Sequence, residues 1–232
     1  IEARWNAAKK DDRANFYASS SMVPGADNLN KLWLYNWTRG QLKNIPGLDS
    51  SNTLTLKLYR DSLTDAEPIT ATAYICGLPG AVGVYTASLA ADTTASLLYD
   101  VWSTGSTEYH TGSAITVKNF KPLAESPNPV YVTSMTSLRP SYSRKETARF
   151  RLFVREKNWS PTIYAKATQT LDSSIIDSGY YKIFRVSDDT EVIPYGTGST
   201  AHTQLSYDQS GSYFDLDMGL LEAGFAYGLN FA

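Results

Sequence analysis

The chain has 232 residues, of which 42% are hydrophobic and only 19% are charged, so it can bury a core and wholesale disorder is excluded. The net charge of −2 provides no overall attraction to nucleic acid or to anionic membranes, and a single cysteine, Cys76, excludes an intrachain disulfide. No run approaches the roughly 18 apolar residues of a membrane-spanning helix.

The chain opens with a charged, Ala-rich segment, which predicts a short helix or an ordered arm at 1–17. Beyond it, apolar and polar residues alternate with a period of two, the pattern of strands that bury one face and expose the other. The alternation is clearest at 53–59, 147–155 and 212–218. Further strands are predicted at 33–37, 69–75, 83–89, 97–102, 114–117, 130–135, 180–186, 203–207 and 225–231.

A proline-rich stretch divides the chain in two. Pro122, Pro127 and Pro129 each lack the backbone donor that a central strand needs. We therefore predict a stiff linker at 121–129 between an N-terminal domain at 1–120 and a C-terminal domain at 130–232. About a dozen short strands with regular turns are typical of sandwiches rather than of α/β units. The predicted fold is all-β, with two tandem antiparallel β-sandwich domains.

Residues 221–227, Leu-Glu-Ala-Gly-Phe-Ala-Tyr, indicate the type of the second sandwich. Immunoglobulin-like sandwiches often cross between sheets at a Leu, a Pro or small residue, a Gly, and a Tyr three positions later. The hydroxyl of that Tyr bonds to the backbone of the corner. Tyr227 and Gly224 fit this pattern, with Ala223 where Pro is common, although an ordinary glycine turn would have the same composition. The corner predicts an immunoglobulin-like domain.

In that topology the strands at 147–156 and 211–218 pair with each other. Arg149 and Arg151 are then expected to face Asp215 and Asp217 across the ladder. The two aspartates and Asp208 also suggest a Ca²⁺ cage, but they lack the closely spaced oxygen ligands of calcium loops. Charge pairing is the preferred interpretation, and neither a metal nor a cofactor is predicted.

The strand assignment reaches the end of the chain before the last strand of such a domain. A sandwich without that strand exposes an edge and part of its core. We expect either that the chain is cut from a longer protein or that another chain donates the strand.

Trp33, Tyr35 and Trp37 share one face of the strand predicted at 33–37. Such a row of rings is compatible with sugar stacking, with a face that a neighbouring subunit covers, or with an ordinary core. Of these interpretations, core packing ranks first, a subunit contact second and glycan binding third.

No catalytic residue is predicted. His110 and His202 lie in turns rich in Ser, Thr and Gly, without a nucleophile or acid at a diagnostic spacing, and Cys76 ends an apolar strand where a buried thiol is usual. A basic cluster in the second domain lacks the aromatic platforms of nucleic-acid binding and is interpreted as a solvated or intersubunit patch. It comprises Arg139, Arg144, Lys145, Arg149 and Arg151.

Several segments of the second domain carry a resemblance to a known family. They are 149–161 (RFRLFVREKNWSP), 180–186 (YYKIFRV), 192–196 (VIPYG), 205–208 (LSYD) and 211–218 (GSYFDLDM). These segments resemble structural proteins of tailed bacteriophages, especially phages of marine hosts, over roughly 130–232. In that family the pattern continues past the position of Phe231, and no catalytic residues are assigned. The resemblance implies a virion component of the capsid surface, the neck or collar, or the tail.

We therefore expect a non-enzymatic virion structural protein that is assembled in the bacterial cytoplasm. Its expected partners are other virion proteins, with a homo-oligomer in a symmetric assembly and neither nucleic acid nor membrane. The alternative is an extracellular adhesion or carbohydrate-binding β-sandwich module.

Overall fold

The computed structural model describes residues 6–20, 22–48, 53–76, 82–118, 129–157, 173–198 and 200–232. Within these ranges the helical elements are three short 3-10 turns, η1 (Asp12–Ala14), η2 (Gly25–Asp27) and η3 (Met218–Leu220). All pairings between the named strands are antiparallel. The predicted all-β antiparallel class is confirmed. No helix in the described part of the chain has the length and apolar character needed to cross a membrane.

The chain divides into two compact units, an N-terminal unit of residues 10–124 and a C-terminal unit of residues 125–232 with residues 1–9. The sequence analysis placed residues 1–9 in the first domain. The structure corrects this, because Lys9 bonds to a strand of the C-terminal unit. The predicted linker at 121–129 lies outside the described residues except for Pro129.

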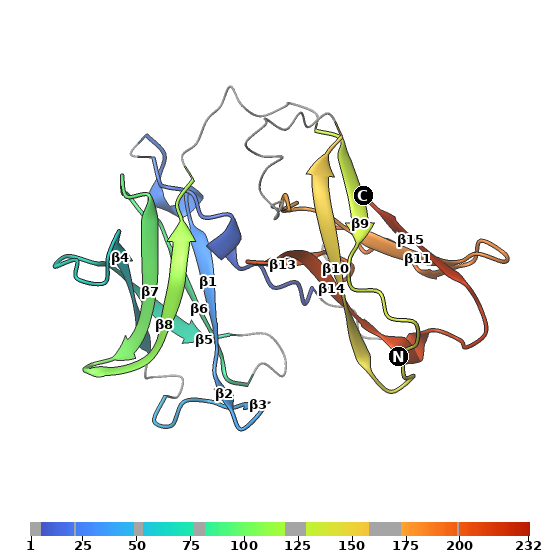
Figure 1. Ribbon diagram of the computed structural model, residues 1–232, viewed down its shortest axis with the longest axis horizontal. Helices are drawn as coiled ribbons and strands as arrows, with labels where there is room; N and C mark the ends of the chain where they lie inside the picture. The colour runs from blue at the N-terminus through green and yellow to red at the C-terminus, as the bar shows by residue number, and fades with distance from the viewer. Residues whose placement is uncertain are drawn as a thin grey trace. The chain divides into compact units, whose positions relative to one another are not determined.

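The N-terminal unit contains one six-stranded sheet in the order β1-β6-β5-β4-β7-β8 (Figure 1). Its strands are β1 (Asn30–Tyr35), β4 (Leu54–Arg60), β5 (Ile69–Ile75), β6 (Val84–Leu89), β7 (Leu97–Thr104) and β8 (Thr107–Thr116). A short hairpin of β2 (Trp37–Thr38) and β3 (Gln41–Leu42) follows β1. The strand predicted at 33–37 therefore begins earlier and ends at Tyr35, and the one predicted at 114–117 is the end of a longer strand.

An arm at residues 10–19 connects the two edges of this sheet. Tyr17 forms a parallel bridge with Lys118, just beyond β8, and exchanges two hydrogen bonds with the Asn30 side chain at the start of β1. The expected helix or arm is thus an arm with one 3-10 turn, η1. Because the arm reaches both edges, the sheet curves around one core in which Phe16, Leu56 and Trp102 are fully buried.

The C-terminal unit has two sheets over a shared core. One has the order β13-β14-β10-β9 and the other has the order β12-β11-β15. Phe214 of the first sheet stacks on Tyr181 of the second, with ring centroids 4.3 Å apart. The strands are β9 (Tyr131–Met135), β10 (Thr147–Glu156), β11 (Tyr181–Arg185), β12 (Glu191–Ile193), β13 (Ser206–Asp208), β14 (Gly211–Asp217) and β15 (Tyr227–Phe231).

Two details of this unit differ from the sequence analysis. Strand β12 was not predicted, and β13 is shorter than the strand predicted at 203–207. The free side of β13 is covered by the start of the chain, where Tyr207 N–H donates to the Lys9 carbonyl and Lys9 N–H donates to Ser206 Oγ, both at 3.0 Å.

Candidate functional site

The largest exposed rings of the N-terminal unit lie around the outer face of its sheet, away from the main core. Trp33 and Tyr74 both face Thr86 across the ladder, so their side chains are on one side of the sheet. Trp33 is buried with Cys76 and Val84, and Tyr35 and Leu42 pack against this small cluster. Trp37 is 63% exposed and lies opposite Leu42 in the hairpin, and Tyr74 is 59% exposed. We call Tyr35, Trp37, Leu42 and Tyr74 the aromatic patch.

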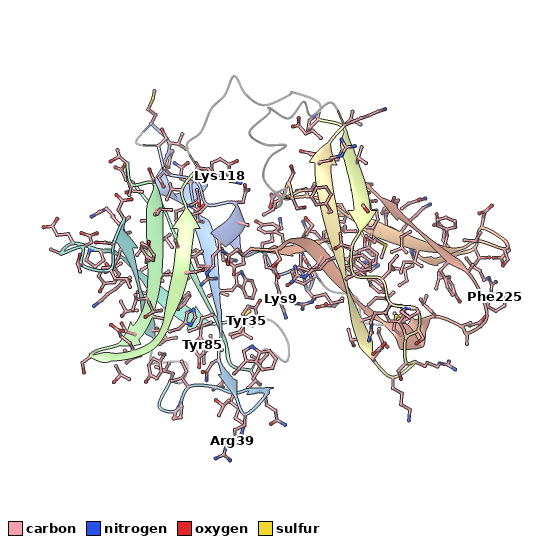
Figure 2. The ribbon with its side chains drawn as sticks, in the orientation of Figure 1. Lys9, Tyr35, Arg39, Tyr85, Lys118 and Phe225 are labelled. Atoms are coloured by element: carbon pink, nitrogen blue, oxygen red, sulfur yellow. The ribbon has the colours of Figure 1, made fainter. Side chains whose placement is uncertain are left out.

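The hairpin that carries Trp37 is held in place by local sequence. Arg39 and Gly40 both have positive φ, as the central residues of a type I′ turn do, and the Arg39 side chain projects away from the hairpin tip (Figure 2). Behind the hairpin, Gly83 has φ +69, and a Cβ on it would lie 2.6 Å from the Lys43 backbone. Asn36 Nδ2 donates to the Lys43 carbonyl at 2.7 Å. These contacts fix the angle at which Trp37 is presented.

The predicted row of Trp33, Tyr35 and Trp37 is only partly present. Trp33 and Tyr35 do stack, with centroids 6.3 Å apart and planes at 13°. Trp33 is only 5% exposed, however, and its indole N–H donates to the Lys10 carbonyl at 2.6 Å. Trp37 belongs to a different strand because β1 ends at Tyr35. A continuous stacking platform for a sugar is therefore not formed, and Trp37 is the exposed ring of the three.

A charge ladder crosses the exposed face of β10 and β14 in the C-terminal unit. Arg149 lies directly opposite Asp215, and its guanidinium binds both carboxylate oxygens at 2.8 and 3.0 Å. Arg151 binds both oxygens of Asp208 at 2.8 and 2.7 Å. The ring of Tyr213 lies under both cations, at 4.2 Å from Arg149 Cζ and 5.3 Å from Arg151 Cζ. The ladder is therefore a pair of bidentate ion pairs over one tyrosine.

The predicted partner of Arg151 is wrong. The residue opposite Arg151 is Tyr213, and Asp217 lies opposite Thr147 and accepts a hydrogen bond from Gly219 N–H at 2.9 Å. Burial opposes ionisation of Asp208, but the bonds from Arg151 outweigh it and lower the pKa of Asp208. The bond to Asp215 is the main reason that the pKa of Arg149 is raised.

The corner before β15 has the backbone bonding that the sequence predicts. Tyr227 Oη accepts a hydrogen bond from Glu222 N–H at 2.9 Å and donates one to the Glu222 carbonyl at 3.0 Å. Gly224, between them, has φ +90. One hydroxyl thus bonds both backbone groups of one corner residue.

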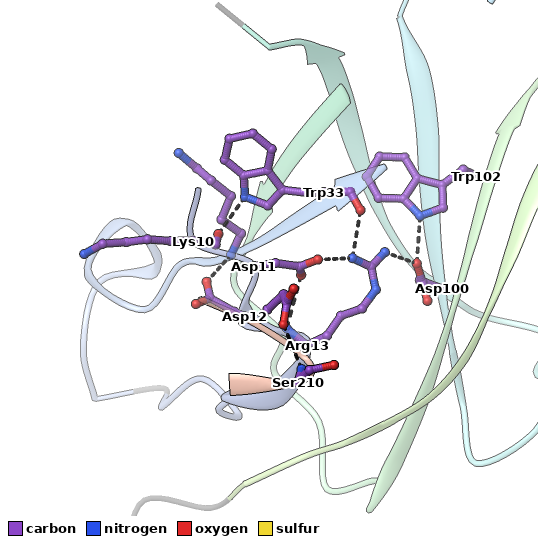
Figure 3. Close-up of polar contacts among 10 residues, drawn as sticks. Lys10, Asp11, Asp12, Arg13, Trp33, Asp100, Trp102 and Ser210 are labelled. Carbon is purple, nitrogen blue, oxygen red and sulfur yellow. Dashed lines mark hydrogen bonds and ion pairs between the residues drawn. The ribbon is translucent and has the colours of Figure 1, made fainter. Parts of the chain in front are cut away.

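The sequence analysis missed a buried charged cluster in the N-terminal unit (Figure 3). Arg13, in η1, binds Asp11 at 2.6 Å and Asp100 of β7 at 2.5 Å, and it also donates to the Trp33 carbonyl at 2.8 Å. The Asp100 oxygen that Arg13 contacts, Oδ2, also accepts a hydrogen bond from the Trp102 indole N–H at 2.8 Å. Asp100 Oδ1 has no hydrogen-bond partner among the described residues. Two acids and one base therefore share a site that is almost closed to water.

Burial and the mixture of charges change the pKa values of Asp11 and Arg13. Burial raises the pKa of Asp11 to about 6, and attraction to Arg13 offsets only part of that effect. Burial opposes the charge of Arg13, but Asp11 and Asp100 outweigh it and raise the pKa of Arg13. Gly112 makes room for Asp100, because a Cβ there would overlap the Asp100 carboxylate. The cluster attaches the arm to β1 and β7.

The histidines and the cysteine are not brought together. His110 is exposed on β8 of the N-terminal unit, and His202 belongs to the C-terminal unit, where its Nδ1 is buried. Cys76 is buried beneath the aromatic patch. Among the described residues, no three His, Cys, Asp or Glu side chains lie close enough together to hold a metal ion.

Comparisons of the chain with family models, with curated proteins and with solved structures gave no match.

Proposed function

We propose that this chain is a structural component of a particle and works through protein–protein contacts, with no chemistry of its own. The observation that carries the proposal is the aromatic patch. Trp37 and Tyr74 expose more than half of their surface, whereas Trp33 and Trp102 of the same unit are buried. Tyr and Trp are enriched at protein interfaces because they provide a large, rigid contact area with a polar end.

The second support is the rigidity of the surfaces. In the C-terminal unit, exposed Arg149 and Asp215 are tied to each other in two-bond geometry and stacked over Tyr213. Side chains that are already fixed lose little entropy when a partner covers them. The aromatic patch is fixed in a similar way, by the turn at Gly40 and the close packing at Gly83.

We further propose that the C-terminal unit is immunoglobulin-like and that the particle is the virion of a tailed phage. The strand orders β13-β14-β10-β9 and β12-β11-β15 are those expected of such a domain without its last strand. The hydrogen bonds of Tyr227 support the same assignment. The virion assignment rests on the resemblance of residues 130–232 to phage structural proteins.

The decisive experiment is quantitative mass spectrometry of purified particles from cells that produce the chain. The chain is expected at a fixed copy number per particle. A Trp37→Ala, Tyr74→Ala double variant is expected to be depleted at least about tenfold, because central aromatic anchors typically contribute 2 kcal/mol or more. Tyr109→Ala, which removes an exposed ring on β8 outside the patch, is the matched control and is expected to assemble normally. Absence of the chain from particles would refute the assignment.

A carbohydrate-binding module is the second candidate, and the exposure of Trp37 is the observation that favours it. One ring is a small platform because Trp33 is buried and bonded to Lys10. Titration of oligosaccharides into the chain tests this candidate. Heat of binding that disappears in Trp37→Ala would support it, and binding that persists in that variant would place any sugar elsewhere.

A further inference from the structure

Charge is unevenly distributed along the sequence that forms the aromatic patch and its surroundings. Residues 28–48, which include β1 and the hairpin of the patch, contain three basic residues and no acidic one. Residues 68–91, which include β5 and β6, contain no charged residue. The acidic residues between these two segments are Asp61, Asp65 and Glu67, all in the connection from β4 to β5, and Asp49, which lies outside the described residues. We call residues 61–67 the acidic turn.

The aromatic patch and the acidic turn belong to opposite ends of one sheet. Strands β1 and β5 both pair antiparallel with β6, so β1 and β5 run in the same direction. The hairpin of the patch follows the end of β1, whereas the acidic turn precedes the start of β5 (Figure 1). Because the sheet separates these two features within one copy, they can meet only between two copies.

The rim of the aromatic patch is basic. Arg39 is at the tip of the hairpin and Lys43 directly follows Leu42, and both side chains are exposed. Neither side chain forms an ion pair with any other described residue. The patch therefore combines exposed aromatic rings with positive charge that is not neutralised within the described residues, and this favours a partner that is both apolar and acidic.

The acidic turn has that composition and is held in a fixed shape. Asp65 accepts hydrogen bonds from the backbone N–H groups of Arg60 and Glu67, both at 3.1 Å, and Arg60 Nη1 donates to the Glu67 carbonyl at 2.7 Å. Asp61 Oδ1 accepts two backbone N–H groups at the start of β7, both at 3.2 Å. These bonds leave Leu63 49% exposed, and the exposed Glu67 carboxylate forms no ion pair with a described residue.

We propose that the aromatic patch binds the acidic turn of a second copy of this chain, head to tail. In this contact Leu63 packs on the exposed rings of the patch, and Glu67 faces the basic side chains Arg39 and Lys43. Both surfaces are held by local hydrogen bonds before they meet, so little ordering entropy is lost on contact. The inference rests on the proposed function, which makes the patch a protein contact, and it names the partner.

A contact of this kind repeats from copy to copy. The two surfaces differ, so each copy offers its patch to one neighbour and its acidic turn to another, which produces a closed ring or a filament. The charged side chains favour this pairing over patch against patch, because two basic rims repel each other. Repetition also allows a contact that is weak by itself to become strong in an assembly.

Charge-reversed variants of the full chain test the pairing. Sedimentation velocity is expected to show that Arg39→Glu alone and Glu67→Lys alone associate with a Kd at least about tenfold higher than that of the natural chain, because like charges meet in each contact. An equimolar mixture of the two variants is expected to recover the natural association, because alternating copies then place opposite charges in every contact. Lys145→Glu, an exposed reversal in the C-terminal unit, is the matched control and is expected to associate normally. A mixture no stronger than either variant alone would overturn the proposed pairing.

Leucine variants test the apolar part of the contact. Leu63→Ser is expected to weaken association by at least about tenfold, because the leucine no longer covers the rings of the patch. Leu138→Ser removes a leucine that is 64% exposed in the C-terminal unit, and it is expected to have no effect. Circular dichroism confirms that each variant is folded. If Trp37→Ala weakens association while Leu63→Ser and Glu67→Lys do not, the patch binds another surface and the proposal is overturned.

The outcomes for the proposed function and for this contact are separable. A natural chain that stays monomeric at millimolar concentration would overturn the head-to-tail contact even if the chain is found in particles. A chain that associates through Arg39 and Glu67 but is absent from particles would refute the proposed function alone.

Discussion

The buried carboxyl of Asp11 makes the stability of the N-terminal unit depend on pH. Burial beside Asp100 raises the pKa of Asp11 from 3.8 to about 6, so the folded state holds this proton more tightly than the unfolded chain does. The proton on Asp11 therefore stabilises the folded state, and this stabilisation is complete below pH 3.8 and is lost as the pH rises through about 6. A difference of about two pKa units corresponds to about 3 kcal/mol in the free energy of unfolding.

The substitution Asp11→Asn mimics the protonated form. Asn keeps an oxygen that can accept the hydrogen bond from Arg13 N–H. It removes the charge that burial and Asp100 disfavour, so the variant is expected to equal the natural chain near pH 4 and to exceed its stability by up to about 3 kcal/mol at pH 7. The side chain of Asp11 is only 12% exposed, so solvent screens little of this effect.

Urea unfolding at several pH values between 4 and 7.5 measures the difference between the two proteins. Other titrating groups contribute equally to both and cancel in that difference. Asp27→Asn, which removes an exposed charge of the same unit, is the control and is expected to give a difference close to zero at every pH. A difference for Asp11→Asn that does not change between pH 4 and pH 7 would refute the reasoning, as would destabilisation that grows with pH.

Three further changes test the other assignments. Tyr227→Phe is expected to destabilise the C-terminal unit by about 1 kcal/mol, measured by urea unfolding, because two backbone hydrogen bonds are lost at an exposed corner. A double-mutant cycle of Arg149→Ala and Asp215→Ala is expected to give a coupling of about 0.2–1 kcal/mol that weakens in high salt, and zero coupling would deny the ion pair an energetic role. Gly83→Ala is expected to lower the thermal unfolding midpoint of the N-terminal unit by several degrees, because the new Cβ overlaps backbone at positive φ; an unchanged midpoint would show that the loop adapts.

Strands with one buried and one exposed face were predictable because alternation records that asymmetry. The first half of β8 was missed because residues 107–113 are mostly polar and exposed, so the edge strand lacks an apolar face there. The hairpin at Arg39 and Gly40 was missed because its strands have two residues each, too few to show a period. Periodicity therefore identifies strands that contribute to a core and says little about strands that do not.

The charge ladder shows what sequence alone can and cannot fix. The pairing of β10 with β14 was anticipated, and Arg149 does meet Asp215. The error at Arg151 arises because antiparallel partners run in opposite directions: two residues onward from Arg149 corresponds to two residues back from Asp215, at Tyr213. Asp208 was available instead because the tight turn into β14 brings it near β10.

The sequence does contain one indication of the buried charged cluster around Arg13, in the strand predicted at 97–102. Inward positions of the strand predicted at 97–102 are Leu98, Asp100 and Trp102, so the same alternation places a carboxylate in the core. A charge at such a position requires a partner of opposite sign. The alternation does not say where that partner is, because Arg13 lies 87 residues away in an arm without periodicity.

Residues 6–19 follow no period because they bond mainly at strand edges and not through one buried face. Lys9 bonds to β13 of the C-terminal unit. Tyr17, in the arm of the N-terminal unit, bonds to Asn30 at the start of β1 and bridges to Lys118 just beyond β8. Hydrogen bonds of this kind satisfy backbone groups of an edge without an apolar pattern, so hydrophobic periodicity carries no record of them.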